Sequence, residues 1–407
     1  MHIAFFTNYY HPVVNGVVRS VASFRETLMR QGHNVFVFAQ HDANYKDEEP
    51  FIFRYPSLPL PLGDISTAIP VSPFVDQLLP ALKLDVIHTH HPILLGQTAA
   101  RKAAEMDLPL VFTFHTKYWD YTHYVPFPQE AIQEFLKNAV HKWLRDFMQK
   151  CQHIIIPSES MKDILVKDYG LDQHYTVVPT GTNLEPFLNA DGDALRKEKG
   201  WQDETILISV GRLGAEKNWE TLLRAFAKIY PGHADARLVL IGDGPSKEEL
   251  QSLAGEFGVG ERVTFMGSLP FGEVPSYLKA ADVFSFASVT ETQGLVTIEA
   301  MAAGLPVVAV DGSGTRDIVE HGKQGLLVEN DVDALAKGLH DLLSDPHQLK
   351  RFGNSALKKA KTFDVNQLAK QIITVYEEAV ETKKAGEYVT LRAEDTASQP
   401  AVSSTQT

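Results

Sequence analysis

Short apolar runs with strand character alternate with segments of helical periodicity along nearly the whole chain, and this alternation strongly constrains the fold. In the first half, "HIAFFTN" is followed by the helix-like "GVVRSVASFRETLMRQGH" and then by "NVFVFAQ". The pattern restarts near residue 205, where "TILISVGRL", "NWETLLRAFAKIY" and "ARLVLIGDGP" repeat the same order. Strands that alternate with helices form parallel sheets covered by helices. We therefore expect an α/β protein of two Rossmann-like, doubly wound domains that face a central cleft.

The domain boundaries follow from length and from turn residues. A chain of 407 residues is too long for one typical domain and fits two. We expect an N-terminal domain over residues 1–183 and a C-terminal domain over 184–365, joined by the Pro-, Gly- and Asn-containing "VVPTGTNLEPF". Residues 366–385 have helical periodicity. The polar, aperiodic residues 386–407 are predicted to form a disordered tail.

Composition excludes several classes of protein. A formal net charge of −13 argues against a nucleic-acid-binding protein. The single cysteine, Cys151, excludes a disulfide framework and fits a reducing compartment. The first residues, "MHIAFFTNYYHP", lack the basic and apolar regions of a signal peptide, and no apolar run is long enough to span a bilayer. We expect a cytoplasmic protein.

Two cations, Arg212 and Lys217, lie five positions apart in "VGRLGAEKNWE", a loop between a predicted strand and a predicted helix. Such a loop can direct both cations at one anion. A diphosphate suits this pair, because arginine binds two oxygens with its fork and lysine adds a point charge. The alternative is a solvated loop with two unrelated cations.

Two acids, Glu291 and Glu299, lie eight positions apart in "ETQGLVTIEA", where a strand is followed by a loop and a helix. The helix is predicted to start near Gly294, and free N–H groups at a helix start favour an anion. Glu299 would lie one turn into the helix, within reach of a ribose diol, and Glu291 would face a sugar hydroxyl. The alternative is that Glu291 caps the helix and Glu299 lies on the surface.

Gly16 lies in the first strand-to-helix loop, "NYYHPVVNGVVRS", where the missing side chain would let the backbone approach a phosphate. This loop is not the GxGxxG dinucleotide fingerprint, which disfavours an NAD-dependent oxidoreductase. Two other motifs are interpreted as decoys. "DGD" at 191–193 is predicted to cap a helix, and "GSGTRD" at 312–317 starts like a dinucleotide loop but ends in Asp317.

Histidines cluster in "HTHHP" and "TFHTKYWDYTHY". Five of them invite a metal interpretation: His88, His90, His91, His115 and His123. We expect no metal, because no cysteine or clear carboxylate ligand lies nearby. Instead, the histidines that follow strands are expected to point into the cleft as hydrogen-bonding groups. His115 ends the apolar strand "LVFTF" and is the best candidate for contact with a substrate.

Taken together, the motifs closely resemble a known family. "GRL" followed by Lys217, then "GDGP", "VTFMG" and "ETQGLVTIEAMAAGLPVVA" in this order resemble the retaining nucleotide-sugar glycosyltransferases of family 4. The resemblance covers about residues 1–380 and implies the GT-B fold, in which two Rossmann-like domains face each other. Glu291 and Glu299 match the Glu-x7-Glu motif that is typical of this family.

The resemblance implies roles for the charged residues. Arg212 and Lys217 would bind the donor diphosphate and stabilise it as it leaves. Glu291 would contact the transferred sugar and Glu299 would hold the ribose, with His115 beside the donor sugar. Members of the family require no metal and no other cofactor.

A second group of residues would contact the donor through backbone or apolar atoms. The resemblance implies this role for Gly16, Phe265, Met266, Gly267, Gln293, Gly294 and Leu295. The base would lie near residues 265–267, and the backbone of 293–295 would contact sugar and phosphate. Gly16 would approach the diphosphate from the opposite domain. The last helix, residues 366–385, would cross back to the first domain.

A narrower resemblance concerns the acceptor. "HTHHPILLGQTAARKAAEMDLPLVFTFHTKYWDYTHYVP" and "VVPTG" are similar to the diacylglycerol glucosyltransferase branch, which glycosylates a lipid at a membrane surface. The similarity implies a nucleoside-diphosphate hexose donor, with UDP-glucose favoured, and a lipid acceptor. A soluble acceptor such as an inositol or a small acid is the first alternative. A nucleotide-sugar epimerase or a non-catalytic binder on the same fold is a weaker one.

The segment "AIQEFLKNAVHKWLRDFMQK" has an apolar stripe at helical spacing, with basic residues beside it. A basic amphipathic helix can lie on an anionic membrane, at the inner face of the cell membrane for a cytoplasmic protein. The residues expected to contact such a surface are Lys137, Lys142, Trp143 and Arg145. The alternative is a helix whose apolar stripe faces the core of its own domain.

Overall fold

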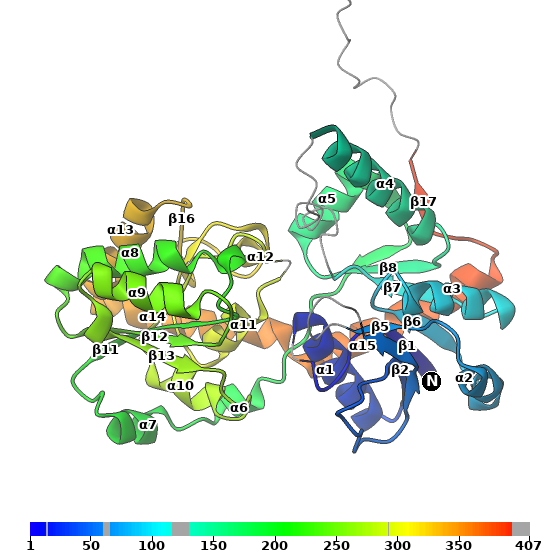
Figure 1. Cartoon of the computed structure of the whole chain (residues 1–407), viewed down its shortest axis with the longest axis horizontal. Helices are drawn as coiled ribbons and strands as arrows, with labels where there is room; N and C mark the ends of the chain where they lie inside the picture. The colour runs from blue at the N-terminus through cyan, green and yellow to red at the C-terminus, as the bar shows by residue number, and fades with distance from the viewer. Residues whose placement is uncertain (14, 60–65, 116–129, 292, 393–407) are drawn as a thin grey trace, which may run out of the picture.

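The computed structural model describes residues 1–13, 15–59, 66–115, 130–291 and 293–392, and they form two α/β domains side by side (Figure 1). Each domain is built on one parallel sheet, and the expected GT-B architecture is confirmed. Helices cover both faces of each sheet, so the central strands are buried almost throughout, whereas the strands at the sheet edges are mostly half-buried.

The N-terminal sheet has the strand order β10-β8-β7-β6-β1-β2-β3, and every neighbouring pair is parallel. Its strands are β1 (His2–Thr7), β2 (Asn34–Gln40), β3 (Ile52–Tyr55), β6 (Val86–Thr89), β7 (Leu110–Thr113), β8 (His153–Ile156) and β10 (Tyr175–Val177). Side chains alternate between the two faces with the strand period of two. Ile3 and Phe5 of β1 pack on one face, and Ala4 and Phe6 pack on the other.

Five helices of the N-terminal half cover this sheet, together with the short hairpin of β4 (Ser57–Pro59) and β5 (Ser66–Ala68). They are α1 (Gly16–Arg30), α2 (Pro73–Leu78), α3 (Leu95–Glu105), α4 (Glu130–Met148) and α5 (Glu159–Tyr169). Their ends follow local rules. The Asn15 side chain accepts from the Val18 N–H at the start of α1, and α5 starts at the Ser158 cap and ends at the left-handed Gly170.

The C-terminal sheet has the order β13-β12-β11-β14-β15-β16 and is also parallel. Its strands are β11 (Thr205–Val210), β12 (Ala236–Ile241), β13 (Val263–Gly267), β14 (Val283–Phe286), β15 (Val307–Val310) and β16 (Gly325–Val328). The strand order reverses between β11 and β14. In doubly wound folds, ligands bind beyond the carboxyl ends of the strands at such a reversal.

The helices of this domain flank two apolar clusters, one on each face of the sheet. They are α6 (Glu185–Leu188), α7 (Gly192–Lys199), α8 (Trp219–Ile229), α9 (Lys247–Glu256), α10 (Val274–Ala280), α11 (Leu295–Ala302), α12 (Ser313–Arg316), α13 (Val332–Leu343) and α14 (Pro346–Ala360). All of these helices except α12 contribute side chains to the two clusters. Asp191 caps α7 by accepting from the Ala194 N–H, so the prediction that "DGD" caps a helix is confirmed.

The last long helix, α15 (Val365–Lys384), packs on the N-terminal domain against α1, β7 and β8 (Figure 1). Val365, Leu368 and Ile372 share a buried cluster with Ile3 and Phe5 of β1. The N-terminal sheet is therefore covered on one face by α1 and α15 and on the other by α2 to α5.

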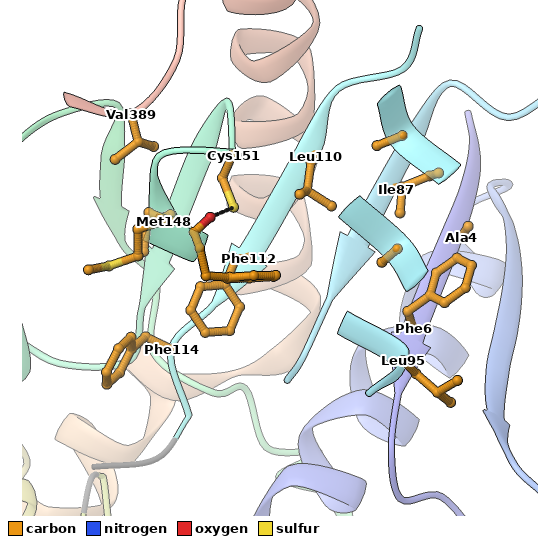
Figure 2. Packing of buried hydrophobic residues seen from close by; sticks show 14 of the residues in the cluster. Ala4, Phe6, Ile87, Leu95, Leu110, Phe112, Phe114, Met148, Cys151 and Val389 are labelled. Atoms are coloured by element: carbon orange, nitrogen blue, oxygen red, sulfur yellow. Dashed lines mark hydrogen bonds between the residues drawn. The ribbon is translucent and has the colours of Figure 1, made fainter. Parts of the chain in front are cut away.

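The chain continues in ordered contact beyond residue 386, where the disordered tail was expected to begin. β17 (Thr390–Leu391) pairs with β9 (Leu171–Gln173), and Val389 is buried beside Cys151 and Met148 (Figure 2). The Val389 N–H donates to the Cys151 carbonyl over 2.9 Å. Residues 393–407 lie outside the described residues.

Candidate active site

The loop after β11 carries the two predicted cations. Lys217 ends a short 3-10 helix, Ala215–Lys217, and its ammonium forms an ion pair with the Glu291 carboxylate. Arg212 instead pairs with Glu216, Nη1 to Oε1 over 3.2 Å, and its side chain is 65% exposed. Trp219 anchors the loop, because its Nε1–H donates to the Arg212 carbonyl over 2.9 Å. The structure thus brings Lys217 onto Glu291 and leaves Arg212 pointing toward solvent on the same loop.

The loop after β14 holds Glu291 from several sides. The Ser288 hydroxyl donates to Glu291 Oε1 over 3.2 Å, and the Gly314 N–H donates to the Glu291 carbonyl over 3.1 Å. Gly314 must be a glycine here, because a Cβ would lie 2.6 Å from that carbonyl oxygen. The side chain of Glu291 is 17% exposed and is therefore partly shielded from water. Shielding strengthens its interaction with any nearby charge or hydroxyl.

Helix α11 begins directly after this loop, at Leu295, with Gly294 in the left-handed conformation (φ 76°) before it. The first N–H groups of such a helix have no partner within the helix and can bind an anion. The start of α11 at Leu295, after β14 and its loop, confirms the predicted order of strand, loop and helix around the Glu-x7-Glu motif.

Gln293 has a role that sequence reasoning missed. Its side chain is 4% exposed and clasps the segment between the domains: Oε1 accepts from the Thr180 N–H over 2.6 Å, and Nε2 donates to the Thr180 carbonyl over 3.0 Å. This pair of bonds fixes the loop after β14 to the interdomain connection. The backbone contact with a donor that the resemblance implies for Gln293 remains a prediction.

Glu299 lies on α11 and is 1% exposed, so the alternative of a surface glutamate is excluded. Its carboxylate forms an ion pair with Arg19 of α1, in the N-terminal domain. The Arg19 guanidinium also lies over the Phe271 ring, 4.8 Å from its centroid, and burial lowers the pKa of Arg19 to about 10. Arg19 was not among the predicted site residues. The available signal was its place three residues after Gly16, on the same face of α1.

Gly16 is the first residue of α1 and is exposed. A Cβ built at Gly16 would meet no atom within 4 Å, so the fold itself does not require a glycine here. Phe265, Met266 and Gly267 end β13 and are half-buried, and the Gly267 carbonyl accepts from the Gly242 N–H over 2.9 Å. Whether these four residues contact a donor remains a prediction.

The buried histidines gather at the carboxyl ends of β6 and β7. His90 Nδ1 and His115 Nε2 are 3.0 Å apart, and His88 bonds Tyr376 of α15 and Thr113, each over 2.7 Å. Burial lowers the pKa of His88 to about 3, and it holds the pKa values of His90 and His115 well below the usual range. These imidazoles are therefore neutral near pH 7 and act as hydrogen-bonding groups without charge.

His91 completes the cluster. Its Nδ1 accepts from the Asn8 N–H over 3.1 Å, and burial lowers its pKa to about 4. Among the described residues, no group of His, Cys, Asp or Glu side chains is arranged to hold a metal ion. His123 lies outside the described residues.

The residues predicted to contact a membrane divide into two kinds. Lys137 and Lys142 are exposed on α4. Trp143 is partly buried against the core of its own domain, and Arg145 donates to the carbonyls of Tyr169 and Arg392. In the part of the chain that the structure describes, no helix has the length and apolarity needed to cross a membrane.

Comparison with known proteins assigns both halves to one class of enzyme. Residues 14–186 match the family described as "Glycosyltransferase Family 4", and residues 191–359 match "Glycosyl transferases group 1". An alpha-monoglucosyldiacylglycerol synthase from Acholeplasma laidlawii is 32% identical over 92% of this chain and 96% of its own length. A Streptococcus pneumoniae protein of the same name is 33% identical over 85% of this chain and 79% of its own. A D-inositol 3-phosphate glycosyltransferase from Nocardia farcinica is 32% identical over 73% of this chain and 67% of its own.

Solved structures agree on the fold. Sucrose-phosphate synthase from Thermosynechococcus elongatus superposes with a TM-score of 0.77 at 25% identity, over 94% of this chain and 99% of that one. Anabaena HepE in complex with UDP superposes with a TM-score of 0.74 at 20% identity, over 93% of this chain and 100% of that one. The two domains, the Glu-x7-Glu loop and these matches establish that the chain is a retaining glycosyltransferase of family 4 with the GT-B fold.

Proposed function

We propose that this enzyme transfers a hexose, with glucose favoured, from UDP-glucose to a lipid such as diacylglycerol. The observation that carries the proposal is the contact between Lys217 and Glu291, which arrive from two separate loops at the carboxyl edge of the C-terminal sheet. A cation and a carboxylate at one point suit a diphosphate and a sugar hydroxyl bound side by side. The two diacylglycerol-glycosylating relatives align with 92% and 85% of this chain, which supports the same acceptor here.

The donor occupies the C-terminal domain in this proposal. Lys217, Arg212 and the start of α11 bind the diphosphate, and Glu291 accepts from a hydroxyl of the hexose. Glu299 accepts from the ribose diol, and the base lies against the end of β13, at residues 265–267. Gly16 leaves space for the diphosphate from the opposite domain, which accounts for a glycine whose Cβ would meet no protein atom.

The reaction exchanges one bond at the anomeric carbon for another. The bond from that carbon to the diphosphate oxygen breaks with its electron pair going to the diphosphate, and the acceptor oxygen forms the new bond on the same face. The acceptor proton passes to the leaving phosphate. Negative charge therefore grows on the diphosphate in the transition state, where Lys217, Arg212 and the N–H groups of α11 stabilise it. Neutral His115 offers the sugar a hydrogen bond without opposing the developing positive charge on the ring.

The acceptor occupies the N-terminal domain and arrives from an anionic membrane surface. Lys137 and Lys142 are exposed on one helix, α4, and each cation near such a surface contributes about 1 kcal/mol of attraction. Replacing both with glutamate should reduce binding to vesicles that contain phosphatidylglycerol and leave binding of UDP unchanged. If vesicle binding is unchanged, α4 does not contact the membrane surface and this part of the proposal is wrong.

The function is tested with labelled donors and a lipid acceptor. The enzyme is incubated with UDP-glucose, UDP-galactose or GDP-mannose and with vesicles that contain diacylglycerol. Label from UDP-glucose should enter the lipid fraction, and Lys217→Met should abolish most of this transfer. If no label enters the lipid fraction from any of the three donors, the proposal of a lipid acceptor is wrong.

A soluble acceptor is the second candidate, because the Nocardia farcinica relative is named for D-inositol 3-phosphate and is also 32% identical. The same donors are therefore supplied with inositol phosphates and without vesicles. Transfer to the water-soluble acceptor alone would favour this candidate. Conversion of the free sugar nucleotide without any acceptor would instead indicate an epimerase, and tight donor binding without turnover would indicate a binder.

A further inference from the structure

We infer that Arg19 of the N-terminal domain competes with the donor for Glu299: its guanidinium pairs with the Glu299 carboxylate until the donor ribose displaces it. The inference rests on the proposed role of Glu299 as the ribose-binding residue. It adds a residue from the opposite domain, and it makes donor binding an exchange of one partner of Glu299 for another.

The geometry links the two domains through this one carboxylate. Arg19 lies on the first turns of α1, and Glu299 lies on α11, 280 positions later in the chain. Glu299 is 1% exposed, whereas the Arg19 side chain is 28% exposed. The guanidinium pairs with the carboxylate and also lies over the exposed Phe271 ring. The arginine is therefore the partner that can leave toward water, and the glutamate is the one that must stay.

A buried carboxylate needs hydrogen-bond donors, and two kinds of group supply them at this position. The Arg19 Nη2–H group donates to Glu299 Oε1 in the structure. A ribose offers two adjacent hydroxyls, both of which can donate to the same carboxylate. The Arg19 guanidinium and the ribose hydroxyls therefore compete for the oxygens of the Glu299 carboxylate. The ribose therefore gains its bonds at the cost of an ion pair, and removing one partner from a buried pair is costly unless another group replaces it.

The exchange lowers the apparent affinity for the donor. A ligand that binds only when a competing contact is broken shows an apparent dissociation constant equal to the intrinsic one divided by the fraction of molecules in which that contact is open. Burial disfavours the charged form of Arg19. When the guanidinium is released it becomes hydrated again, and this partly offsets the free energy lost with the ion pair. Arg19 thus sets the nucleotide affinity without being a group that the reaction needs.

Titration calorimetry with UDP tests the inference on four variants and the unaltered enzyme. Arg19→Gln should bind UDP about tenfold more tightly, since it removes the competing charge. Arg19→Lys keeps a cation at this position and should stay close to the unaltered affinity. Arg30→Gln is the matched control, because Arg30 lies on the same helix, is exposed and contacts residues of its own helix, Glu26 at 4.0 Å and the Thr27 hydroxyl at 3.1 Å. Its UDP affinity should not change.

Glu299→Gln separates this inference from the proposed function. If Glu299→Gln leaves UDP affinity unchanged, the ribose role of Glu299 fails and the donor arrangement with it. If Glu299→Gln weakens binding but Arg19→Gln does not tighten it, only the exchange fails. Weaker UDP binding by Arg19→Gln would show that Arg19 contacts the donor directly, and it would overturn the inference. Thermal unfolding of each variant verifies that it is folded.

Discussion

Replacing Lys217 with methionine removes the ammonium and keeps a side chain of similar length at the centre of the proposed site. In the structure this ammonium faces Glu291, and the two side chains are 20% and 17% exposed. Such partly buried charges interact with an effective dielectric constant of about 20, which gives about 4 kcal/mol for unit charges ~4 Å apart. The charge that grows on the leaving diphosphate would interact with Lys217 on the same scale.

That energy translates into a large loss of rate. With about 1.4 kcal/mol for each factor of ten, and part of the interaction already present with the bound donor, Lys217→Met should lower kcat by ~10²- to 10³-fold. The assay is the initial rate of labelled glucose transfer to diacylglycerol vesicles at saturating UDP-glucose. KM for the donor should rise much less than kcat falls, because the missing interaction is strongest in the transition state.

Lys228→Met is the matched control for this experiment. Lys228 lies in the same domain on α8, is 52% exposed and pairs with Asp333, so it carries a comparable ion pair at the surface. Its loss should change the rate by less than about twofold, since exposed pairs contribute little. A Lys217→Met enzyme with an unchanged kcat and a raised KM would refute the argument, because the lysine would then only hold the ground state.

Three further predictions follow from the glycines and the buried histidines. Gly16→Ala should leave the free energy of unfolding almost unchanged in urea titrations and weaken UDP binding in calorimetry, since its Cβ meets only space that the donor is proposed to use; equal UDP binding would contradict that use. Gly314→Ala should lower the melting temperature and the transfer rate together, because its Cβ would lie 2.6 Å from the Glu291 carbonyl oxygen, and a variant with unaltered values would show that the loop relaxes freely. Stability should be complete above the ordinary histidine pKa of 6.5 and fall as the pH drops toward the lowered values, about 4 for His91 and about 3 for His88, because the unfolded chain then binds more protons than the folded one. Urea titrations from pH ~7 to pH ~5 measure this slope, and a flat profile would argue against burial of these histidines in solution.

Local patterns were enough to predict the two sheets and the strand, loop and helix around Glu291 and Glu299. The alternation of strand and helix depends on neighbouring residues, so the strands before Lys217 and Glu291 and the helix that carries Glu299 are recognisable in one sequence. The cap at Asp191 is equally local.

Contacts between distant segments were not predictable in this way. The Arg19–Glu299 pair joins residues 280 positions apart, and the Gln293 side chain reaches Thr180 across 113 positions. The spacing from Gly16 places Arg19 on one face of α1, but no local pattern identifies Glu299 or Thr180 as the partners, because both contacts depend on how two finished domains meet. Trp143 shows the same limit, since an apolar stripe alone does not tell a core-facing helix from a membrane-facing one.

The return of α15 to the first domain has a consequence for how the molecule is made. The last strand of the N-terminal sheet, β10, ends at Val177, while Tyr376 and the β17 strand emerge from the ribosome about 200 residues later, roughly 10–40 s at ordinary rates of translation. Throughout that interval the apolar face that α15 covers is open to water and to other nascent chains. A chain stopped after residue 364 would carry the proposed catalytic residues and still lack part of its first domain.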